Sequence, residues 1–400
     1  MHTTILSVLQ IRESERHTME SQHITSLELM ERAGTATTEA ILQWMEEIPC
    51  NHVFVFCGTG NNGGDGLVVA CQLATGASAH IDTVTVVLCQ SPSSRQTPEF
   101  KANYTRWEKL KDIGRTRTIS FNEEQPLEIP ADALVIDAIF GIGLNKPAAG
   151  IQAAAIRAIN ASDAPVVAID TPSGLFADQH TPHTCDIVMA DLTLSMQFQK
   201  LAFLLPENHP FYGYVQVLDI GISMPPTMKV TQEMLTTNGV RPLLRPRFPY
   251  AHKGTFGNGL LIAGSASMPG AAILAATAAM RGGIGKLTLH TAAKAASYVP
   301  AALPEAILHT DIEPQHVSRI DWHTLPPNIN AIAIGPGLGT HPKTVALVKD
   351  VLDSVQAPII LDADALNILA DNKTRLAFPP QGRLLTPPFV DVERPAGHGT

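Results

Sequence analysis

Residues 58–66 read GTGNNGGDG and lie between the apolar runs 53–57 and 67–70. A buried strand that breaks into a glycine turn and then opens a helix presents free backbone N–H groups to an anionic ligand. Three of the glycines also satisfy the loose G-x-G-x-x-G spacing of dinucleotide-binding folds. The turn adds two asparagines and Asp65, which a plain pyrophosphate turn does not need, so it indicates further chemistry.

The length and composition indicate a compact protein that acts on small molecules. A chain of 400 residues exceeds one ordinary core and suits two domains. A hydrophobic content of 45% with 16% charged residues is typical of large buried parallel sheets, whose strands are continuous apolar runs. The formal net charge of −9 and the lack of a local Lys/Arg cluster provide no surface for a nucleic-acid backbone.

The cysteines and the N-terminus together predict a reducing, cytoplasmic location. The 5 cysteines are odd in number and form no C-x-x-C pair, which favours neither a disulfide framework nor a zinc site. The apolar stretch 5–11 lacks a preceding basic segment and runs into the charged RESER at 12–16, unlike a signal peptide. No apolar run approaches the roughly 20 residues that span a bilayer.

Apolar runs alternate with helical periods along the first half. Thr25 and Glu28 have capping-box spacing, and apolar residues then recur at helical steps from Leu29 to Trp44, which predicts a helix that covers the first sheet. The strand-like runs are 53–57, 84–88, 133–136, 166–169 and 192–194, with a helical stretch at 151–159. This βαβ rhythm predicts a Rossmann-like, three-layer domain with a parallel sheet.

The pattern breaks after residue 222, where five prolines stiffen an irregular stretch. Beyond it the α/β character resumes, with strand-like runs at 260–263, 286–290, 331–334 and 358–361 and an alanine-rich helix at 271–280. The predicted segments are a first domain over 1–222, a proline-rich linker over 223–249 and a second α/β domain over 250–400.

Three further polar residues follow strands of the first half. Asp137 lies in VIDAIFGIGLNKP, and Asp170 and Ser173 lie in AIDTPSGLFAD. Loops beyond the carboxyl ends of parallel strands converge on one crevice, so these residues can share a site. Asn62, Asp137 and Ser173 supply amide, carboxylate and hydroxyl oxygens, which suit an alkali or alkaline-earth cation rather than zinc. Taken singly, Asp137 and Asp170 are equally compatible with capping a following helix.

In this order, GTGNNGGDG, DAIFGIG and DTPSG resemble the NAD(P)H-hydrate epimerase domain, the first half of the bifunctional NAD(P)H-hydrate repair enzymes. The stretches ELMERAG, ADLTLSMQFQK and VLDIGI agree with it, so the resemblance covers about residues 1–222. The resemblance implies an enzyme that interconverts the two epimers at the hydrated nicotinamide carbon of damaged NADH or NADPH.

The resemblance also implies roles for individual residues. Asp170 would contact the reacting ring and act as the catalytic acid/base, provided that it lies within hydrogen-bond reach of the epimerising carbon. Potassium would bind Asn62, Asp137 and Ser173, in agreement with the cation site inferred above. The dinucleotide would contact Asp170 and two loops: Asn61, Asn62, Gly63, Gly64 and Asp65, and then Gly141, Ile142, Gly143, Leu144, Asn145, Lys146 and Pro147.

The second half resembles the ribokinase-like dehydratase half of the same enzymes, which uses ADP or ATP to restore NAD(P)H from its hydrate. The residues that carry the resemblance are HKGTFGNGLLIAGSASMPGAAILAATAAMRGGIGKLTLHT (252–291), AIGPGLG (333–339) and ILDADALNIL (360–369). Glycines in GPGLG permit close backbone approach to a ligand, and Asp362 and Asp364 follow a strand as oxygen partners. By the same resemblance, Ala271 and Gly337 would contact a dinucleotide, with ADP or ATP as co-substrate.

Two departures affect this second half. The family has Leu-Thr-Pro-His where the sequence has LTPP ending at Pro388, so a side chain that can ionise and hydrogen-bond is replaced by one that cannot. The given sequence also ends at Thr400, before the G-G-x-G-D-x-L segment of that family. We therefore expect an incomplete ribokinase-like domain in which Gly270, Ala271 and Gly337 still contact a dinucleotide while dehydration is weak or absent.

Other interpretations stay open. A nicotinamide-dependent oxidoreductase would explain the glycine spacing, but Asp82 precedes its strand and is badly placed to hold a ribose hydroxyl. A small-metabolite kinase would need the anion-hole segment that these residues lack. A non-catalytic dinucleotide-binding protein would have little use for an ion site beside an acid, and cation-dependent turnover would discriminate. The resemblance further implies a homo-oligomer with a small-molecule substrate and no nucleic-acid or membrane partner.

Overall fold

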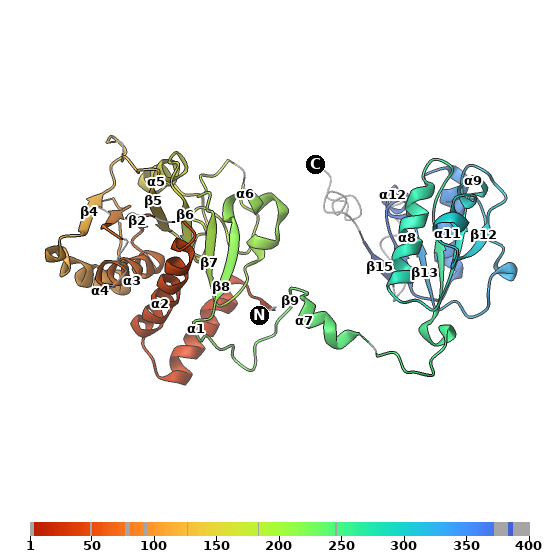
Figure 1. Ribbon diagram of the computed structural model, residues 1–400, viewed down its shortest axis with the longest axis horizontal. Helices are drawn as coiled ribbons and strands as arrows, with labels where there is room; N and C mark the ends of the chain where they lie inside the picture. The colour runs from red at the N-terminus through yellow and green to blue at the C-terminus, as the bar shows by residue number, and fades with distance from the viewer. Residues whose placement is uncertain are drawn as a thin grey trace. The chain divides into compact units, whose positions relative to one another are not determined.

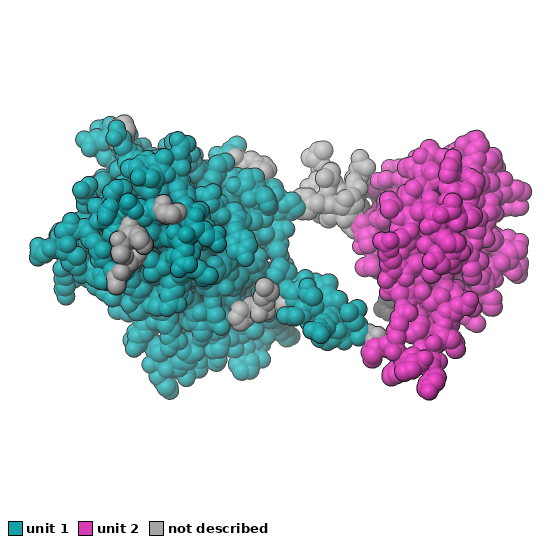
Figure 2. Space-filling view, in the orientation of Figure 1, with its two compact units in different colours: residues 1–244 teal, residues 245–400 magenta. Residues whose placement is uncertain are grey.

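The protein is described by a computed structural model with two compact units, residues 1–244 and 245–400 (Figure 2). Each unit is built around one parallel sheet with an apolar core on both faces, which confirms the predicted α/β fold class. The described residues are 4–48, 50–76, 81–91, 94–125, 127–182, 184–244, 246–371 and 383–386. Within these ranges, no helix has both the length and the apolar character needed to cross a membrane.

The sheet of unit 1 has seven parallel strands in the order β4-β3-β2-β5-β6-β7-β8. The chain builds from β2 to one edge and then returns to build from β5 to the other, so the order reverses between β2 and β5 (Figure 1). This is the Rossmann-like arrangement that the sequence predicts. The strands are β2 (His52–Cys57), β3 (Thr83–Leu88), β4 (Thr116–Ser120), β5 (Ala133–Ala138), β6 (Val166–Ile169), β7 (Leu192–Met196) and β8 (Tyr214–Leu218).

The five strands predicted for the first half are confirmed, and two strands of this seven-stranded sheet were not predicted. The missed strands, β4 and β8, are the two edges of the sheet, and most of their residues are not buried. An edge strand contacts a neighbour on one side only, so its sequence need not form the continuous apolar run that marks a central strand.

Two apolar clusters flank the sheet of unit 1 because successive strand residues point to opposite faces. Val55 belongs to the cluster under the first four helices, whereas Phe56 belongs to the cluster under α5. The capping box predicted at Thr25 and Glu28 is present at the start of α2. The helices are α1 (Val8–Gln22), α2 (Ser26–Met45), α3 (Asn61–Thr75), α4 (Pro98–Glu108) and α5 (Gly150–Asn160), with short turns α6 (His209–Tyr212) and α7 (Thr237–Val240).

The stretch predicted as a linker is partly ordered on unit 1. β9 (Gln232–Glu233) pairs antiparallel with β1 (Thr4–Ile5), and Met228 and Val230 pack against the first core. The compact unit therefore reaches residue 244, beyond the limit of 222 predicted from the sequence.

Unit 2 repeats the strand order of unit 1 with six parallel strands, β12-β11-β10-β13-β14-β15, and its order reverses between β10 and β13. The four predicted strands and the alanine-rich helix are confirmed. The strands are β10 (Asn258–Ile262), β11 (Lys286–Thr291), β12 (Ile307–Thr310), β13 (Ala331–Ile334), β14 (Ile359–Leu361) and β15 (Arg383–Leu385). The helices are α8 (Pro269–Arg281), α9 (Ala293–Ala296), α10 (Val299–Ala302), α11 (Pro342–Ser354) and α12 (Asp364–Ala370).

Candidate functional site

A cavity of about 770 Å³ lies at the reversal of strand order in unit 1. Its walls come from the loops after β2 and β5, from the end of β6 and from helix α1. Ligands of doubly wound sheets bind at this place because the loops on either side diverge and leave a crevice.

Most of the predicted dinucleotide residues line this cavity. Those on its wall are Asn61, Asn62, Asp65, Gly141, Ile142, Gly143, Leu144, Asn145, Lys146, Pro147 and Asp170. Gly63 and Gly64 are instead buried in the first turn of α3. A Cβ on Gly63 would lie 1.9 Å from the carbonyl oxygen of Gly58, so this glycine serves the close packing of the turn.

The loops after β2 and β5 meet through their backbones. A Cβ on Gly58 would lie 2.1 Å from the carbonyl oxygen of Ile139, and the Gly58 N–H donates to the carbonyl of Ala138 at 3.1 Å. Helix α3 then begins without a side-chain cap, since Gly60 occupies the cap position. Its first N–H groups are therefore available to an anionic ligand, as the sequence predicted.

Asp170 is held in a fixed position at the end of β6. Its φ of 66° lies in the left-handed region, which is uncommon for a residue with a side chain. The carboxylate Oδ1 accepts from the Lys200 ammonium at 2.6 Å and from the Met196 N–H at 3.3 Å. Its Oδ2 accepts from the Ile142 N–H at 3.4 Å. Asp170 thus joins the loop after β5 to the end of β7 while it lines the cavity.

Lys200 is a site residue that the sequence analysis missed, although the ADLTLSMQFQK stretch contains it. Only 1% of its side chain is exposed, and its ammonium also donates to Ser195 Oγ at 2.8 Å and to the Met196 carbonyl at 3.1 Å. A buried ammonium needs an anionic partner. A lysine that directly follows a buried strand in the sequence therefore indicates a nearby carboxylate.

Two more carboxyl groups line the cavity, and neither has a hydrogen-bond or ion-pair partner among the described residues. Burial raises the pKa of Glu15 to about 7, the charge of Asp170 adds to the shift, and Lys200 and Arg12 oppose it. Burial also raises the pKa of Asp65 well above its usual range, reinforced by Asp170 and Glu15. The sequence predicted Asp65 but not Glu15, which lies on α1 outside every motif.

Of the predicted cation ligands, Asp137 and Ser173 contact each other directly. The Ser173 hydroxyl donates to Asp137 Oδ1 at 2.6 Å, and the Ser173 N–H donates to Oδ2 at 2.7 Å. Burial raises the pKa of Asp137 to about 6, against these hydrogen bonds and one from the Ile139 N–H. The described residues place no ammonium or guanidinium in contact with Asp137.

The third predicted ligand, Asn62, lies in the first turn of α3 and faces the turn after β5. Its Oδ1 is 3.2 Å from the position of a Cβ on Gly141, and Ser173 Oγ accepts from the N–H of Phe140 in the same turn at 2.8 Å. Asn62 Nδ2 is buried and has no hydrogen-bond partner among the described residues. Asp137 and Ser173 thus form one group of oxygen donors, and Asn62 lies against the turn that follows β5. The described part of the chain holds no cluster of three His, Cys, Asp or Glu side chains suited to a metal.

In unit 2 the predicted contacts Ala271 and Gly337 lie together where the strand order reverses. A Cβ on Gly337 would lie 2.7 Å from Ala271 Cβ and 2.9 Å from the carbonyl oxygen of Met268. The φ of Gly337 is 65°, which a glycine adopts without strain. The loop after β13 therefore packs against the start of α8.

Asp362 and Asp364, the two aspartates predicted as oxygen partners, contact the same loop. Asp364 Oδ2 accepts from the Gly339 N–H at 2.8 Å, and a Cβ on Gly335 would lie 1.7 Å from the carbonyl oxygen of Asp362. These contacts hold the GPGLG turn against the segment that follows β14. Pro388 lies outside the described residues.

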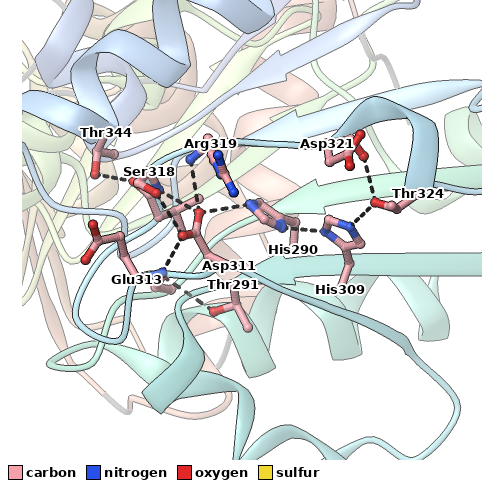
Figure 3. Close-up of polar contacts among 12 residues, drawn as sticks. His290, Thr291, His309, Asp311, Glu313, Ser318, Arg319, Asp321, Thr324 and Thr344 are labelled. Atoms are coloured by element: carbon pink, nitrogen blue, oxygen red, sulfur yellow. Dashed lines mark hydrogen bonds and ion pairs between the residues drawn. The ribbon is translucent and has the colours of Figure 1, made fainter.

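A second network of buried charges lies between β11 and β12 of unit 2 (Figure 3). His290 and His309 are partners in the register of these strands, and their Nδ1 atoms are 2.7 Å apart. His309 Nε2 contacts the hydroxyl of Thr324 at 2.7 Å. Burial lowers the pKa of His309, and the neighbouring His290 adds to the shift.

Asp311 closes the other end of this network (Figure 3). Its Oδ2 is 3.4 Å from His290 Nε2, an ion-pair distance without hydrogen-bond geometry. The carboxylate accepts from the backbone N–H groups of Glu313, Ser318 and Arg319 and from the Ser318 hydroxyl. Burial would raise the pKa of Asp311, but His290 and these donors outweigh it and hold the pKa well below its usual range. The network ties the segment after β12 to the sheet.

Comparison with known proteins relates both units to one kind of enzyme. Residues 26–202 match the family model of the YjeF-related protein N-terminus, and residues 259–397 match that of NAD(P)H-hydrate dehydratase. Helix α1 lies outside both ranges.

Among curated proteins, the chain is 32% identical over 404 residues to the bifunctional NAD(P)H-hydrate repair enzyme Nnr of Moorella thermoacetica, with 96% of this chain and 73% of that one covered. It is also 32% identical to the enzyme of the same name from Salinibacter ruber, with 98% and 75% covered. A solved ADP/ATP-dependent NAD(P)H-hydrate dehydratase from Bacillus subtilis is 36% identical over 40% of this chain and 55% of that one, with a TM-score of 0.34.

Proposed function

The chain belongs to the family of bifunctional NAD(P)H-hydrate repair enzymes, and from this premise we propose that unit 1 interconverts the R and S epimers of hydrated NADH and NADPH. One observation carries the proposal. The cavity at the reversal of strand order brings the two predicted dinucleotide loops together with the buried pair of Asp170 and Lys200.

The cavity suits a charged dinucleotide. Its volume of about 770 Å³ lies within the roughly 300–1,000 Å³ of ligand sites. The uncapped first turn of α3 supplies N–H donors for phosphate, and Arg12, Arg95 and Lys146 line the wall with positive charge. We propose that these groups hold the diphosphate and that the loop after β5 contacts the rest of the dinucleotide.

Asp170 is the group that we propose to contact the reacting ring. Its carboxylate lines the cavity, and Lys200 and two N–H groups keep it in one orientation. In this role it moves a proton while the hydroxyl-bearing centre is opened and reclosed, which is general acid–base catalysis by a positioned side chain.

We propose that Asn62, Asp137 and Ser173 hold a potassium ion. When bound, the ion supplies a fixed positive charge opposite the buried carboxylate of Asp137. The chain itself orients that carboxylate through Ser173 and Ile139. Epimerisation should therefore depend on the alkali cation present, and an Asp137→Asn variant should lose that dependence.

For unit 2 we propose dinucleotide contact by Ala271 and Gly337, with ADP or ATP as co-substrate and weak or absent dehydration by the 400-residue chain. The contact between Ala271 and Gly337 supports the binding loop. Pro388 supports the weak reaction, because its side chain can neither ionise nor hydrogen-bond. We also propose a homo-oligomer, which light scattering of the purified chain would measure.

The experiment supplies the purified chain with the R epimer of hydrated NADH in potassium buffer and follows the R-to-S ratio chromatographically against a protein-free blank. ADP is then added, and the absorbance of NADH is followed. Faster approach to the epimer equilibrium without NADH is the expected result. No epimerisation would favour a dinucleotide-binding protein without this activity, and ADP-dependent NADH formation would contradict the proposal for unit 2.

A further inference from the structure

Three carboxyl groups share the cavity of unit 1, and they are not equivalent. Asp170 forms an ion pair with Lys200 at 2.6 Å and accepts two backbone N–H groups. Glu15 and Asp65 have no partner among the described residues and face the cavity that they line. One carboxyl group is therefore held by its partners, and two remain available to a ligand.

The ion pair with the Lys200 ammonium suits Asp170 to accept a proton in the forward direction of the reaction. Inversion at a carbon that bears a hydroxyl group by breaking its C–O bond needs a donor for the departing oxygen as well as an acceptor for the incoming one. Asp170 supplies the acceptor. The donor has to come from another group on the cavity wall.

Glu15 is better suited than Asp65 to be the proton donor for the departing oxygen. A carboxyl group that exchanges protons near neutrality needs a pKa close to the working pH. The pKa of Glu15 is about 7. Burial, Asp170 and Glu15 raise the pKa of Asp65 well above its usual range, and Asp65 lies on α3 rather than on α1. The charged groups that act on Glu15 are Asp170, Lys200 and, on its own helix, Arg12.

Helix α1 holds Glu15 firmly against unit 1. The N–H of Val8 at the start of α1 donates to Asp178 at 2.9 Å, and the side chain of Gln10 donates to the Lys229 carbonyl at 3.0 Å. Further along, the Ser223 N–H donates to Thr18 at 2.9 Å. Ile11, Arg12, Glu15 and Met19 lie on the face of α1 toward the cavity.

We infer that Glu15 is a second catalytic residue, which donates a proton to the departing hydroxyl of the hydrated ring while Asp170 accepts one from the incoming water. The inference rests on the proposed epimerase function. The proton of Glu15 passes to the hydroxyl oxygen, the C–O bond breaks with its electron pair on that oxygen, and water leaves. The ring nitrogen shares its lone pair with the carbon, so the ring becomes a cation.

Water then adds to the opposite face of this carbon. A new C–O bond forms, and the proton of the added water passes to the Asp170 carboxylate. One water has left and one has entered, so the product is the other epimer. Solvent returns a proton to Glu15 and removes one from Asp170. The reverse reaction uses the two groups in exchanged roles.

The test compares the parent 400-residue chain with Glu15→Gln and with Glu13→Gln, an exposed glutamate on the same helix that does not line the cavity. Epimerisation is measured between about pH 5 and about pH 9, with the uncatalysed rate subtracted. The parent rate should fall above about pH 7. Glu15→Gln should be about 10²- to 10⁴-fold slower and lack this alkaline fall, and Glu13→Gln should match the parent.

Two further measurements separate a failure of the role of Glu15 from a failure of the proposed epimerase function. Glu15→Asp retains a carboxyl group, so it should keep part of the rate and the alkaline fall, and it decides the matter if Glu15→Gln does not fold. In ¹⁸O-water the epimerised product should carry one labelled oxygen, and retention of the original oxygen would overturn the step. A parent without epimerisation contradicts the proposed function, whereas an active parent with an unchanged Glu15→Gln profile contradicts only the role of Glu15.

Discussion

Units 1 and 2 repeat one strand order but place their buried charges at different positions. In unit 1, Asp170 follows β6 and forms part of the wall of the cavity, and Lys200, which follows β7, pairs with it. In unit 2, His290 and Asp311 lie between β11 and β12, beside the edge of the sheet, with 1% and 3% exposed. The shared topology determines where a ligand can reach, and the side chains determine whether that place can do chemistry.

The pair of Asp170 with Lys200 and the pair of Asp311 with His290 also differ in whether unpaired carboxyl groups lie nearby. Asp170 is paired, but Glu15 and Asp65 are not, so the site keeps carboxyl groups that can contact a ligand. Asp311 instead receives four hydrogen bonds and the contact of His290, which leaves the network closed. We propose that the buried charges of unit 1 serve a reaction and that those of unit 2 serve stability.

The largest effect is expected from Lys200→Met. The substitution leaves Asp170 buried without its partner, which should lower the free energy of unfolding of unit 1 by about 3–5 kcal/mol and abolish epimerisation. Hydrogen exchange of peptides from each unit would measure the loss separately. The Lys200→Met/Asp170→Asn double variant should recover stability but not activity. Full activity in Lys200→Met would contradict the role of the pair.

The next effect is expected from Asp311→Asn in unit 2. The pKa of Asp311 is held low in the folded protein, so its contribution is present above about pH 4 and is lost as the pH falls further. The variant should destabilise unit 2 by about 2–3 kcal/mol at neutral pH, with a smaller difference in acid. Denaturation at several pH values, read by hydrogen exchange, would show this. Epimerisation should not change, and a large loss of it would break the distinction between the units.

A smaller effect is expected from Gly58→Ala in the loop after β2, which lines the cavity. The new Cβ would lie 2.1 Å from the Ile139 carbonyl oxygen, so the two loops must separate. We expect a loss of about 1–3 kcal/mol in stability and a rise in KM for the dinucleotide. Gly60→Ala is the matched control, because a Cβ there meets nothing within 4 Å. Equal effects of the two substitutions would show that backbone contact between the loops is unimportant.

The smallest effect is expected from Glu15→Gln on stability. The folded pKa of about 7 exceeds that of an unfolded glutamate, so ionised Glu15 destabilises the fold increasingly as the pH rises from about 4.3 to about 7. The variant should therefore be about 1–2 kcal/mol more stable than the parent above about pH 7, with no difference near pH 4. Thermal melting at both pH values measures it, and a destabilised variant at high pH would contradict the burial of this carboxyl group.

The sequence predicted central elements well and side-chain partners poorly. Continuous apolar runs identified the inner strands of both sheets, and the glycine turn located the cavity, because both signals are local. Lys200 and Asp170 are 30 residues apart, and the contact of His290 with His309 depends on which strands are neighbours. Such pairs require the register of the sheet. Glu15 lies on a polar helix without a motif, so only the packing of α1 places it on the wall.

The most direct test of the account compares the rate of R-to-S epimerisation of hydrated NADH, in potassium buffer, for the parent chain, Asp170→Asn and Asp311→Asn. The account predicts that Asp170→Asn loses the catalysed reaction and that Asp311→Asn keeps the parent rate while unit 2 becomes less stable. An Asp170→Asn variant with the parent rate would contradict the claim that the buried charges of unit 1 carry the chemistry.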